Sequence, residues 1–173
     1  MKPVIFLDFD GVIIIAASYD RAGGLGRQHW LAGTPPIGLG HLIEPALVKN
    51  VQALATEMGG AEVVLSTGWR DERCMDGYRF VLEANGLDAE VVGETPSLRP
   101  RKMSAIVKRS DEISAWLKSN RPADFGKFIV LEDEENVRAL EPRVVYTRFG
   151  TGFDDERLRA AVELWGSINK QES

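Results

Sequence analysis

Two aspartates, Asp8 and Asp10, lie at the end of an apolar run near the start of the chain, where a folded domain normally has no use for charge. The run Val4–Leu7 is uninterrupted, which predicts a strand buried on both faces. Because side chains alternate along a strand, Asp8 and Asp10 are expected to point the same way, with Phe9 opposite. Two carboxylates so close repel each other unless a cation or a shared proton relieves them. The pair therefore predicts chemistry, most simply a hard divalent cation held by oxygen ligands.

A second acidic pair, Glu132 and Asp133, follows another apolar run at 128–131. A charged helix start, favoured by the helix dipole, would explain the next residues, Glu134 and Glu135. It explains the first pair poorly, because those two residues abut a buried strand. In open α/β sheets, ligands bind outside the carboxyl ends of the strands, where the strand order reverses. Both acidic pairs would meet there if strands two and three lie on one side of the first strand, and strands four and five on the other.

The chain alternates strand and helix patterns with no linker between them. Short apolar runs predict strands at 4–7, 62–67, 89–92, 128–131 and 144–147. Apolar positions at helical spacing predict helices at 46–58, 71–85, 110–120 and 154–169, the third with Ser110 as its N-cap. Such alternation predicts an α/β fold, with a doubly wound parallel sheet of five strands and helices on both faces.

Length and composition favour one ordinary globular domain over residues 1–173. No apolar stretch is long enough to span a bilayer, and the first residues run straight into a strand. We therefore expect no signal peptide, no membrane contact and a cytoplasmic protein. The single cysteine, Cys74, excludes an internal disulfide and a thiolate metal cluster. A net charge of -5 disfavours broad nucleic-acid affinity but leaves room for local basic clusters.

Residues 14–43 are rich in glycine and proline. This stretch is too short for a large cap domain, and we expect it to form a flap or loop over the site. Its run 23–26 (Gly-Gly-Leu-Gly) lacks the full spacing of a phosphate-binding loop and does not open a helix directly after a strand. A flexible loop is therefore the favoured interpretation of that run.

The two acidic motifs resemble those of the haloacid dehalogenase (HAD) superfamily, whose members are mostly magnesium-dependent phosphatases. The first family motif is similar to residues 8–12 (Asp-Phe-Asp-Gly-Val), and the fourth, an acidic pair after an apolar strand, is similar to Glu132 and Asp133. Glu132 departs from the family pattern, which usually has Asp, and its extra methylene moves the carboxylate. The resemblance spans nearly the whole chain. It implies the HAD-like Rossmannoid strand order 3-2-1-4-5, with a small insert in place of a large cap.

The second family motif is a hydroxyl residue at the end of a strand, and residues 65–70 (Leu-Ser-Thr-Gly-Trp-Arg) meet it. Strand alternation lets only one of Ser66 and Thr67 point inward, and the family spacing to the following tryptophan and arginine favours Thr67. The resemblance implies that this hydroxyl binds a phosphoryl oxygen. Further expected substrate contacts are Gly11, Gly68 and Arg70.

The third family motif, a Lys or Arg near the start of the helix before strand four, is the least distinct. Lys108 or Arg109 fits best, with Lys102 as a rival. The patterns at 67–70 and 109–117 resemble a small bacterial branch related to the phosphatase-like domains of RNA-repair proteins. A local basic cluster, which could bind nucleotide or RNA phosphates beside the site, comprises Arg99, Arg101, Lys102, Lys108 and Arg109.

The resemblance also implies a role for each group. Asp8 would attack phosphorus to form an aspartyl-phosphate intermediate. Asp10 would protonate the leaving oxygen and later deprotonate the hydrolytic water. Mg²⁺ would bridge Asp8 and the phosphoryl group, assisted by the Asp10 carbonyl and by Glu132 or Asp133. The cation of the third motif would stabilise the transferring charge.

These motifs predict a Mg²⁺-dependent phosphomonoesterase. A phosphotransferase would differ only in the acceptor, and a non-catalytic phosphate-binding domain would need no acid or base at Asp10. The acidity of the chain favours a small phosphate ester or nucleotide as substrate, because extended polyanions would be repelled. The basic cluster would instead suit a nucleic-acid end, as would Trp69 if it stacks on a base. Packing beside the site is the more expected role of Trp69.

Overall fold

The structure is a computed structural model that describes residues 1–23, 40–70, 74–98, 107–122 and 126–171. Its centre is a sheet of five strands in the order β3-β2-β1-β4-β5, and all neighbouring strands are parallel. The strands are β1 (Val4–Leu7), β2 (Glu62–Leu65), β3 (Val91–Glu94), β4 (Phe128–Glu132) and β5 (Val144–Tyr146). The predicted α/β fold and its strand order are confirmed.

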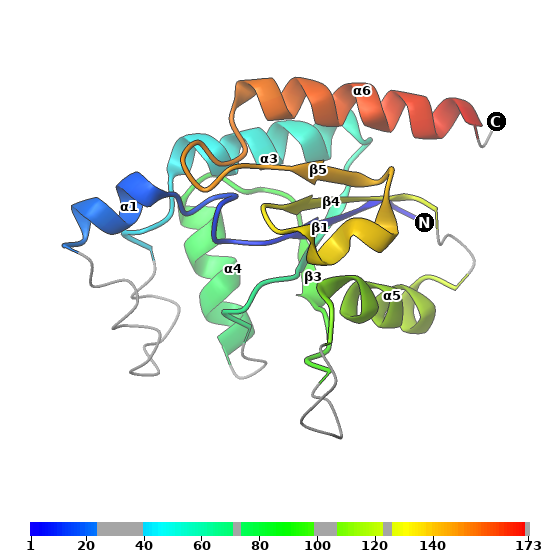
Figure 1. Cartoon of the computed structure of the whole chain (residues 1–173), viewed down its shortest axis with the longest axis horizontal. Coiled ribbons are helices and arrows are strands. Elements are labelled where there is room, and N and C mark those ends of the chain that lie inside the picture. Colours follow the sequence, from blue (N-terminus) through cyan, green and yellow to red (C-terminus); the bar gives the residue numbers. More distant parts are fainter. Residues whose placement is uncertain (24–39, 71–73, 99–106, 123–125, 172–173) are drawn as a thin grey trace.

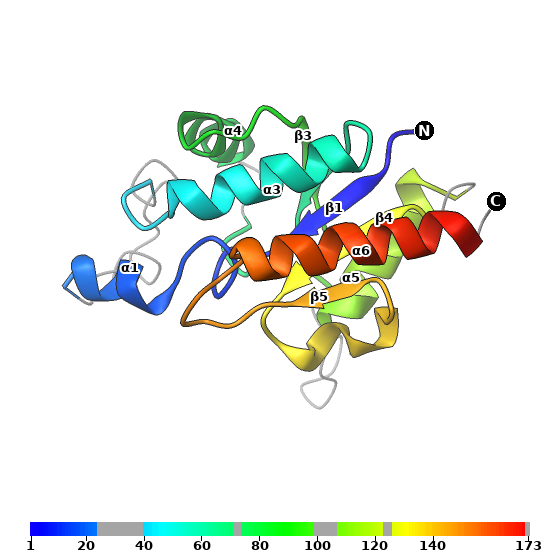
Figure 2. The ribbon, with the colours of Figure 1, turned by 90° about the horizontal axis from the view of Figure 1, so that it is seen from above.

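Helices cover both faces of this sheet (Figure 1). The described helices are α1 (Ala16–Arg21), α3 (Pro45–Glu57), α4 (Met75–Ala84), α5 (Arg109–Asn120), the 3-10 helix η3 (Glu135–Leu140) and α6 (Asp155–Gln171). Helices α3 and α6 pack side by side over one face, as Figure 2 shows from above. Helices α5 and η3 pack together on the other face. None of the described helices combines the length and the apolar character that crossing a membrane requires.

The central strand β1 is buried on both faces, and its side chains alternate between two cores. Ile5 and Leu7 belong to the larger core, which residues of α3, α4 and α6 complete. Val4 and Phe6 belong to the smaller core under α5 and η3. Because a parallel strand between two helical layers has no face toward water, the run Val4–Leu7 can be apolar throughout.

Several predicted boundaries were wrong by a few residues. Strand β2 ends at Leu65 rather than at residue 67, β3 lies at 91–94 rather than 89–92, and β4 includes Glu132. Helix α5 begins at Arg109 with Lys108 as N-cap, so Ser110 is not the cap. The reason is that the Asp111 carboxylate accepts a hydrogen bond from the Lys108 N–H, at 3.3 Å, and supplies the capping interaction.

The expected insert at 14–43 is only partly within the described residues. Its first part forms α1, which begins at Ala16, and its last residues lead into α3. The run 24–39, with most of the glycine-rich motif, lies outside the described residues. The flap interpretation therefore stays a prediction, as does the extent of a single domain.

Candidate active site

The register of the sheet brings the two acidic motifs together at the carboxyl ends of β1 and β4. Leu7 pairs with Leu131, so the following residues, Asp8 and Glu132, are neighbours across the two strands. The Asp8 N–H donates to the Leu131 carbonyl at 3.2 Å, which continues the ladder one residue past β1. By strand alternation, Asp8 follows Phe6 on the face of the sheet that α5 covers. The structure thus brings the two acidic pairs together, as the sequence predicted.

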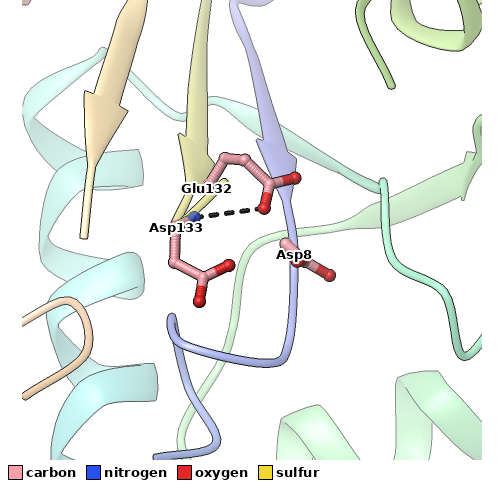
Figure 3. Close-up of side chains that lie close together, drawn as sticks. All are labelled: Asp8, Glu132 and Asp133. Atoms are coloured by element: carbon pink, nitrogen blue, oxygen red, sulfur yellow. Dashed lines mark hydrogen bonds between the residues drawn. The ribbon is translucent and has the colours of Figure 1, made fainter. Parts of the chain in front are cut away.

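Three carboxylates form a compact group at this point: Asp8, Glu132 and Asp133 each offer an oxygen within 4.8 Å of the others (Figure 3). Glu132 Oε1 accepts hydrogen bonds from the backbone N–H groups of Asp133, at 3.1 Å, and Glu134, at 3.2 Å. Glu132 Oε2 is buried without a hydrogen-bond partner among the described residues. An oxygen cluster with an unsatisfied buried oxygen fits a hard divalent cation such as Mg²⁺.

The longer side chain of Glu132, which departs from the HAD pattern, folds back over its own backbone. One carboxylate oxygen is held by the two following N–H groups, and the other remains on the side of Asp8 and Arg109. The extra methylene is therefore accommodated by this turn, and a carboxylate oxygen still reaches the cluster.

Gly11 makes room for Asp133. Its φ of +69° lies in the left-handed region that favours glycine, and a Cβ placed on Gly11 would lie 2.2 Å from Asp133 Oδ2. Any other residue at position 11 would displace that carboxylate. The Thr147 hydroxyl also donates to the Gly11 carbonyl at 2.7 Å, which fixes this turn to the residue after β5.

Burial raises the pKa values of the clustered carboxyl groups. For Asp8 the pKa rises to about 6, because desolvation outweighs the opposing effect of the positive charge on Arg109. For Glu132 the pKa rises to about 10, first by burial and second by the negative charge on Asp8. The pKa of Asp133 is also raised, mainly by burial. Without a cation, burial and mutual repulsion therefore favour retention of a proton by the pair of Asp8 and Glu132.

The stabilisation of the protein by Mg²⁺ is expected to increase with pH. Groups whose folded pKa is raised bind protons more tightly in the folded state, so the metal-free protein loses stability as pH rises above about 4. Mg²⁺ takes the place of the proton, and its binding strengthens as the proton leaves. Melting temperatures with and without Mg²⁺ should therefore diverge between pH about 5 and 8. A Mg²⁺-induced shift that is constant over this range, at matched ionic strength, would contradict the assignment.

The Asp10 carboxylate lies outside this group of three and is held by two aromatic side chains. Trp69 Nε1 donates to Asp10 Oδ2 at 2.8 Å, and the Tyr19 hydroxyl donates to Asp10 Oδ1. Phe9, between the two aspartates, points into the larger core and packs edge-on against Tyr78. Both aspartates thus face the site while Phe9 faces away, as the alternation predicted.

Trp69 therefore packs in the core and also makes a hydrogen bond in the site. Its side chain is mostly buried in the larger core, which agrees with packing beside the site, and its N–H orients Asp10. Sequence reasoning missed that hydrogen bond and missed Tyr19 altogether. Nothing in the spacing of Tyr19 marks it, because the contact depends on how α1 returns toward the end of β1.

Of the two hydroxyl candidates after β2, the structure brings Thr67 to Asp8. The Thr67 hydroxyl contacts the Asp8 carboxylate and lowers its pKa, and it accepts a hydrogen bond from the Trp69 N–H at 3.3 Å. The Ser66 hydroxyl is buried without a partner among the described residues. Gly68 is exposed and leaves open space around the turn.

Of the cation candidates, Arg109 lies in the site. Its side chain is 15 % exposed, its Nε is 3.8 Å from Glu132 Oε2, and its charge lowers the pKa of Asp8. Lys108 is an exposed N-cap and does not line the cavity around Asp8. Lys102 lies outside the described residues, as do Arg99 and Arg101 of the basic cluster.

A buried carboxylate that the sequence did not single out, Glu112, positions Arg109. Glu112 Oε2 accepts hydrogen bonds from Arg109 at 2.9 Å and from Arg70 at 3.0 Å. Its other oxygen, Oε1, accepts from the Leu98 N–H at 3.1 Å. Arg70 lies in this network with its side chain 8 % exposed, and burial and the nearby Arg109 charge lower its pKa. The spacing of Arg109 and Glu112, three residues apart on one helix, was the available signal for their pairing.

Glu112→Gln is expected to destabilise the fold as well as the site. The substitution leaves the buried guanidinium groups of Arg70 and Arg109 without their shared counter-charge, which costs about 3 kcal/mol of unfolding free energy. Chemical denaturation measures this loss. The control is Glu135→Gln, because Glu135 faces Arg138 in an exposed pair at 4.0 Å and its loss costs below about 1 kcal/mol. Equal effects of the two substitutions would contradict the importance of the buried network.

The site opens into a cavity of about 510 Å³. It is lined by Asp8, Asp10, Tyr19, Arg109, Asp133, Glu134 and Phe149. Nucleophilic and acid–base candidates, a cation and the carboxylate cluster therefore share one opening at the carboxyl edge of the sheet. This is the position that ligands take in doubly wound sheets, where the strand order reverses between β2 and β4 around β1.

The sheet order and the acidic site at its switch point define a HAD-like α/β domain. A family model described as "HAD domain in Swiss Army Knife RNA repair proteins" matches residues 4–158, which is most of the chain. The chain belongs to this HAD family, and at that level it is a phosphoesterase or phosphotransferase type of domain. No curated protein and no solved structure was found to match it.

Proposed function

We propose that this chain is a Mg²⁺-dependent phosphomonoesterase that works through an aspartyl-phosphate on Asp8, within a single domain of residues 1–173. One observation carries the proposal: two aspartates in the same cavity have different surroundings. Asp8 lies in the carboxylate cluster beside Arg109, whereas Asp10 stands apart from the cluster and is held by two hydrogen-bond donors. Two carboxyl groups kept in separate environments are suited to separate roles, one as nucleophile and one as acid and base.

The steps follow from these positions. Asp8 attacks phosphorus, the bond to the leaving oxygen breaks, and Asp10 gives its proton to that oxygen. Asp10 then takes a proton from water, which attacks the phosphorus and restores the Asp8 carboxylate. Thr67 would bind a phosphoryl oxygen, and Arg109 would stabilise the charge of the transferring group. Mg²⁺ held by Asp8, Glu132, Asp133 and the Asp10 carbonyl would neutralise charge between nucleophile and phosphate.

The proposal is tested with an aryl phosphate, assayed with Mg²⁺, after chelation, and after Mg²⁺ is restored. Turnover that disappears on chelation and returns with the metal is the expected result. Absence of turnover across a broad panel of phosphate esters, in folded protein that binds Mg²⁺, would contradict it. Added acceptor alcohols distinguish a phosphotransferase, because the phosphoryl group would then appear on the alcohol.

A non-catalytic phosphate-binding domain is the rival of a different class. The two donors that fix Asp10 speak against it, because a binder has no need for an oriented carboxylate next to a phosphate. The family description names RNA-repair proteins, which keeps a nucleic-acid end among the candidate substrates. Asp133 and Glu134 line the same cavity and support a small ester or nucleotide over an extended polyanion.

Substitutions in the acidic cluster are expected to separate metal binding from the rest of the site. Glu132→Asp should keep or tighten Mg²⁺ binding, because a shorter carboxylate restores the usual family residue. The double change Glu132→Ala with Asp133→Ala removes two of three carboxylates and should raise the Mg²⁺ concentration for half-maximal activity at least about tenfold. Mg²⁺ titration of activity and of melting temperature measures both. A double variant with an unchanged Mg²⁺ requirement would exclude this cluster as the metal site.

A further inference from the structure

An exposed aromatic side chain, Phe149, stands at the mouth of the catalytic cavity. Its side chain lines the cavity that contains Asp8 and Asp10, although the residue is 44 % exposed. The other large apolar residues that are exposed in the described part of the chain, Met1, Phe80 and Leu98, do not line this cavity. Together with Tyr19, this ring gives a cavity otherwise lined by carboxylates and an arginine an apolar surface that a bound ligand can contact.

The position of Phe149 is fixed by its backbone. The Ala16 N–H, at the start of α1, donates to the Phe149 carbonyl at 2.9 Å. Phe149 also lies within a turn that is closed by a hydrogen bond from the Gly152 N–H to the Arg148 carbonyl at 2.8 Å. The Phe149 ring then lies 5.9 Å from that of Tyr19, centroid to centroid, at an interplanar angle of 32°. A ring on a hydrogen-bonded backbone, already in contact with a neighbouring ring, loses less conformational freedom on binding a ligand than a ring on a loose segment.

This pair of rings lies on the side of the site where a leaving group must be. The hydroxyl of Tyr19 donates a hydrogen bond to the Asp10 carboxylate, so the Tyr19 ring lies beside that group. In the proposed function Asp10 protonates the leaving oxygen. The leaving group would therefore lie next to Tyr19 and Phe149, and the phosphoryl group would lie toward Asp8 and Arg109, all of which line the same cavity.

We propose that Tyr19 and Phe149 form an aromatic shelf that stacks the planar base of a nucleoside, and that the substrate is a nucleoside phosphate. This inference rests on the proposed function, since it uses Asp10 to locate the leaving group. Stacking suits the shelf because every base presents an apolar face to an aromatic ring, and it requires no particular hydrogen bonds. Glu134 lines the same cavity, and its negative charge disfavours further phosphate groups there. The shelf would therefore recognise the base of the substrate and not the charge of a longer nucleic-acid backbone.

The test compares two substrates with the same phosphorylated sugar: a nucleoside 5′-monophosphate, which has a base at C1, and ribose 5-phosphate, which has a hydroxyl there. The wild-type protein should prefer the nucleotide by at least about fivefold in kcat/KM, given the usual contribution of one base–aromatic stack. Phe149→Leu should lower this ratio, because only the Tyr19 ring of the shelf remains, and Phe149→Trp should preserve it. Phe80→Leu, at an exposed phenylalanine on α4, is the control and should leave the ratio unchanged.

Two results would overturn the shelf while leaving the phosphatase intact. One is equal turnover of nucleotide and ribose phosphate by the wild-type protein. The other is an undiminished nucleotide preference in a folded Phe149→Leu protein. Absence of turnover for every ester would instead refute the proposed function, and the shelf with it.

A second arm identifies the source of the base by comparing the mononucleotide with an oligonucleotide that carries the same terminal nucleotide and phosphate. A higher kcat/KM for the oligonucleotide assigns the shelf to the end of a strand, and a higher value for the mononucleotide assigns it to free nucleotides. In both cases Phe149→Leu must reduce turnover of the preferred substrate at least about fivefold for the inference to stand.

Discussion

Asp8→Asn should reduce turnover by about 10,000-fold or more, because the amide cannot attack phosphorus and no covalent intermediate forms. The side chain keeps its shape, and it loses a charge that burial already disfavours. The variant should therefore fold, with a melting temperature in the absence of Mg²⁺ equal to or above that of the wild type. Steady-state assays measure the first effect and thermal unfolding the second.

The nucleophile is identified directly by trapping the intermediate. Acid quenching during turnover of a labelled phosphate ester should leave label on the wild-type protein, on the peptide that contains Asp8, and none on Asp8→Asn. Retention of label by the variant would place the intermediate on another residue. Retention of turnover without any label would support direct attack by water instead.

Asp10→Asn should lower turnover of an alkyl phosphate by about 100- to 10,000-fold, the usual contribution of a general acid and base. An aryl phosphate has a good leaving group and needs less help from an acid. The rate at which it phosphorylates Asp8 should therefore fall less than the rate with an alkyl phosphate. The phosphorylated protein should then accumulate, because Asp10 is also needed to activate water. Rapid-quench measurements of product and phosphoprotein, for both esters, check this difference.

Mg²⁺ binding is the control for Asp10→Asn. The Asp10 carboxylate lies outside the cluster of Asp8, Glu132 and Asp133, and only its carbonyl is proposed as a ligand, so the Mg²⁺-induced rise in melting temperature should persist. A variant that lost this rise, yet turned over normally at saturating Mg²⁺, would show that the Asp10 side chain is a metal ligand and not the acid and base.

The sequence by itself determined the sheet and the meeting of its acidic motifs. Apolar runs that end in carboxylates at 4–10 and 128–133 are a local pattern, because a buried parallel strand has no polar face and its functional groups must follow its end. Alternation along the strand then places Asp8 and Asp10 toward the site and Phe9 away from it. Element boundaries were less accurate, since capping by Asp111 in place of Ser110 depends on details of one turn.

Only the tertiary structure decided which groups surround those carboxylates. Arg109 was one of three candidate cations, and its contact with the site depends on the side of the sheet to which α5 returns. Tyr19, which binds Asp10 and reaches Phe149, has no distinctive spacing in the chain. Glu112 lies three residues from Arg109 on one helix, but its contact with Arg70 joins distant parts of the chain and forms only when helices and loops pack. A sequence pattern predicts which way the side chains of one strand point, but it does not predict which side chains from other elements pack against that strand.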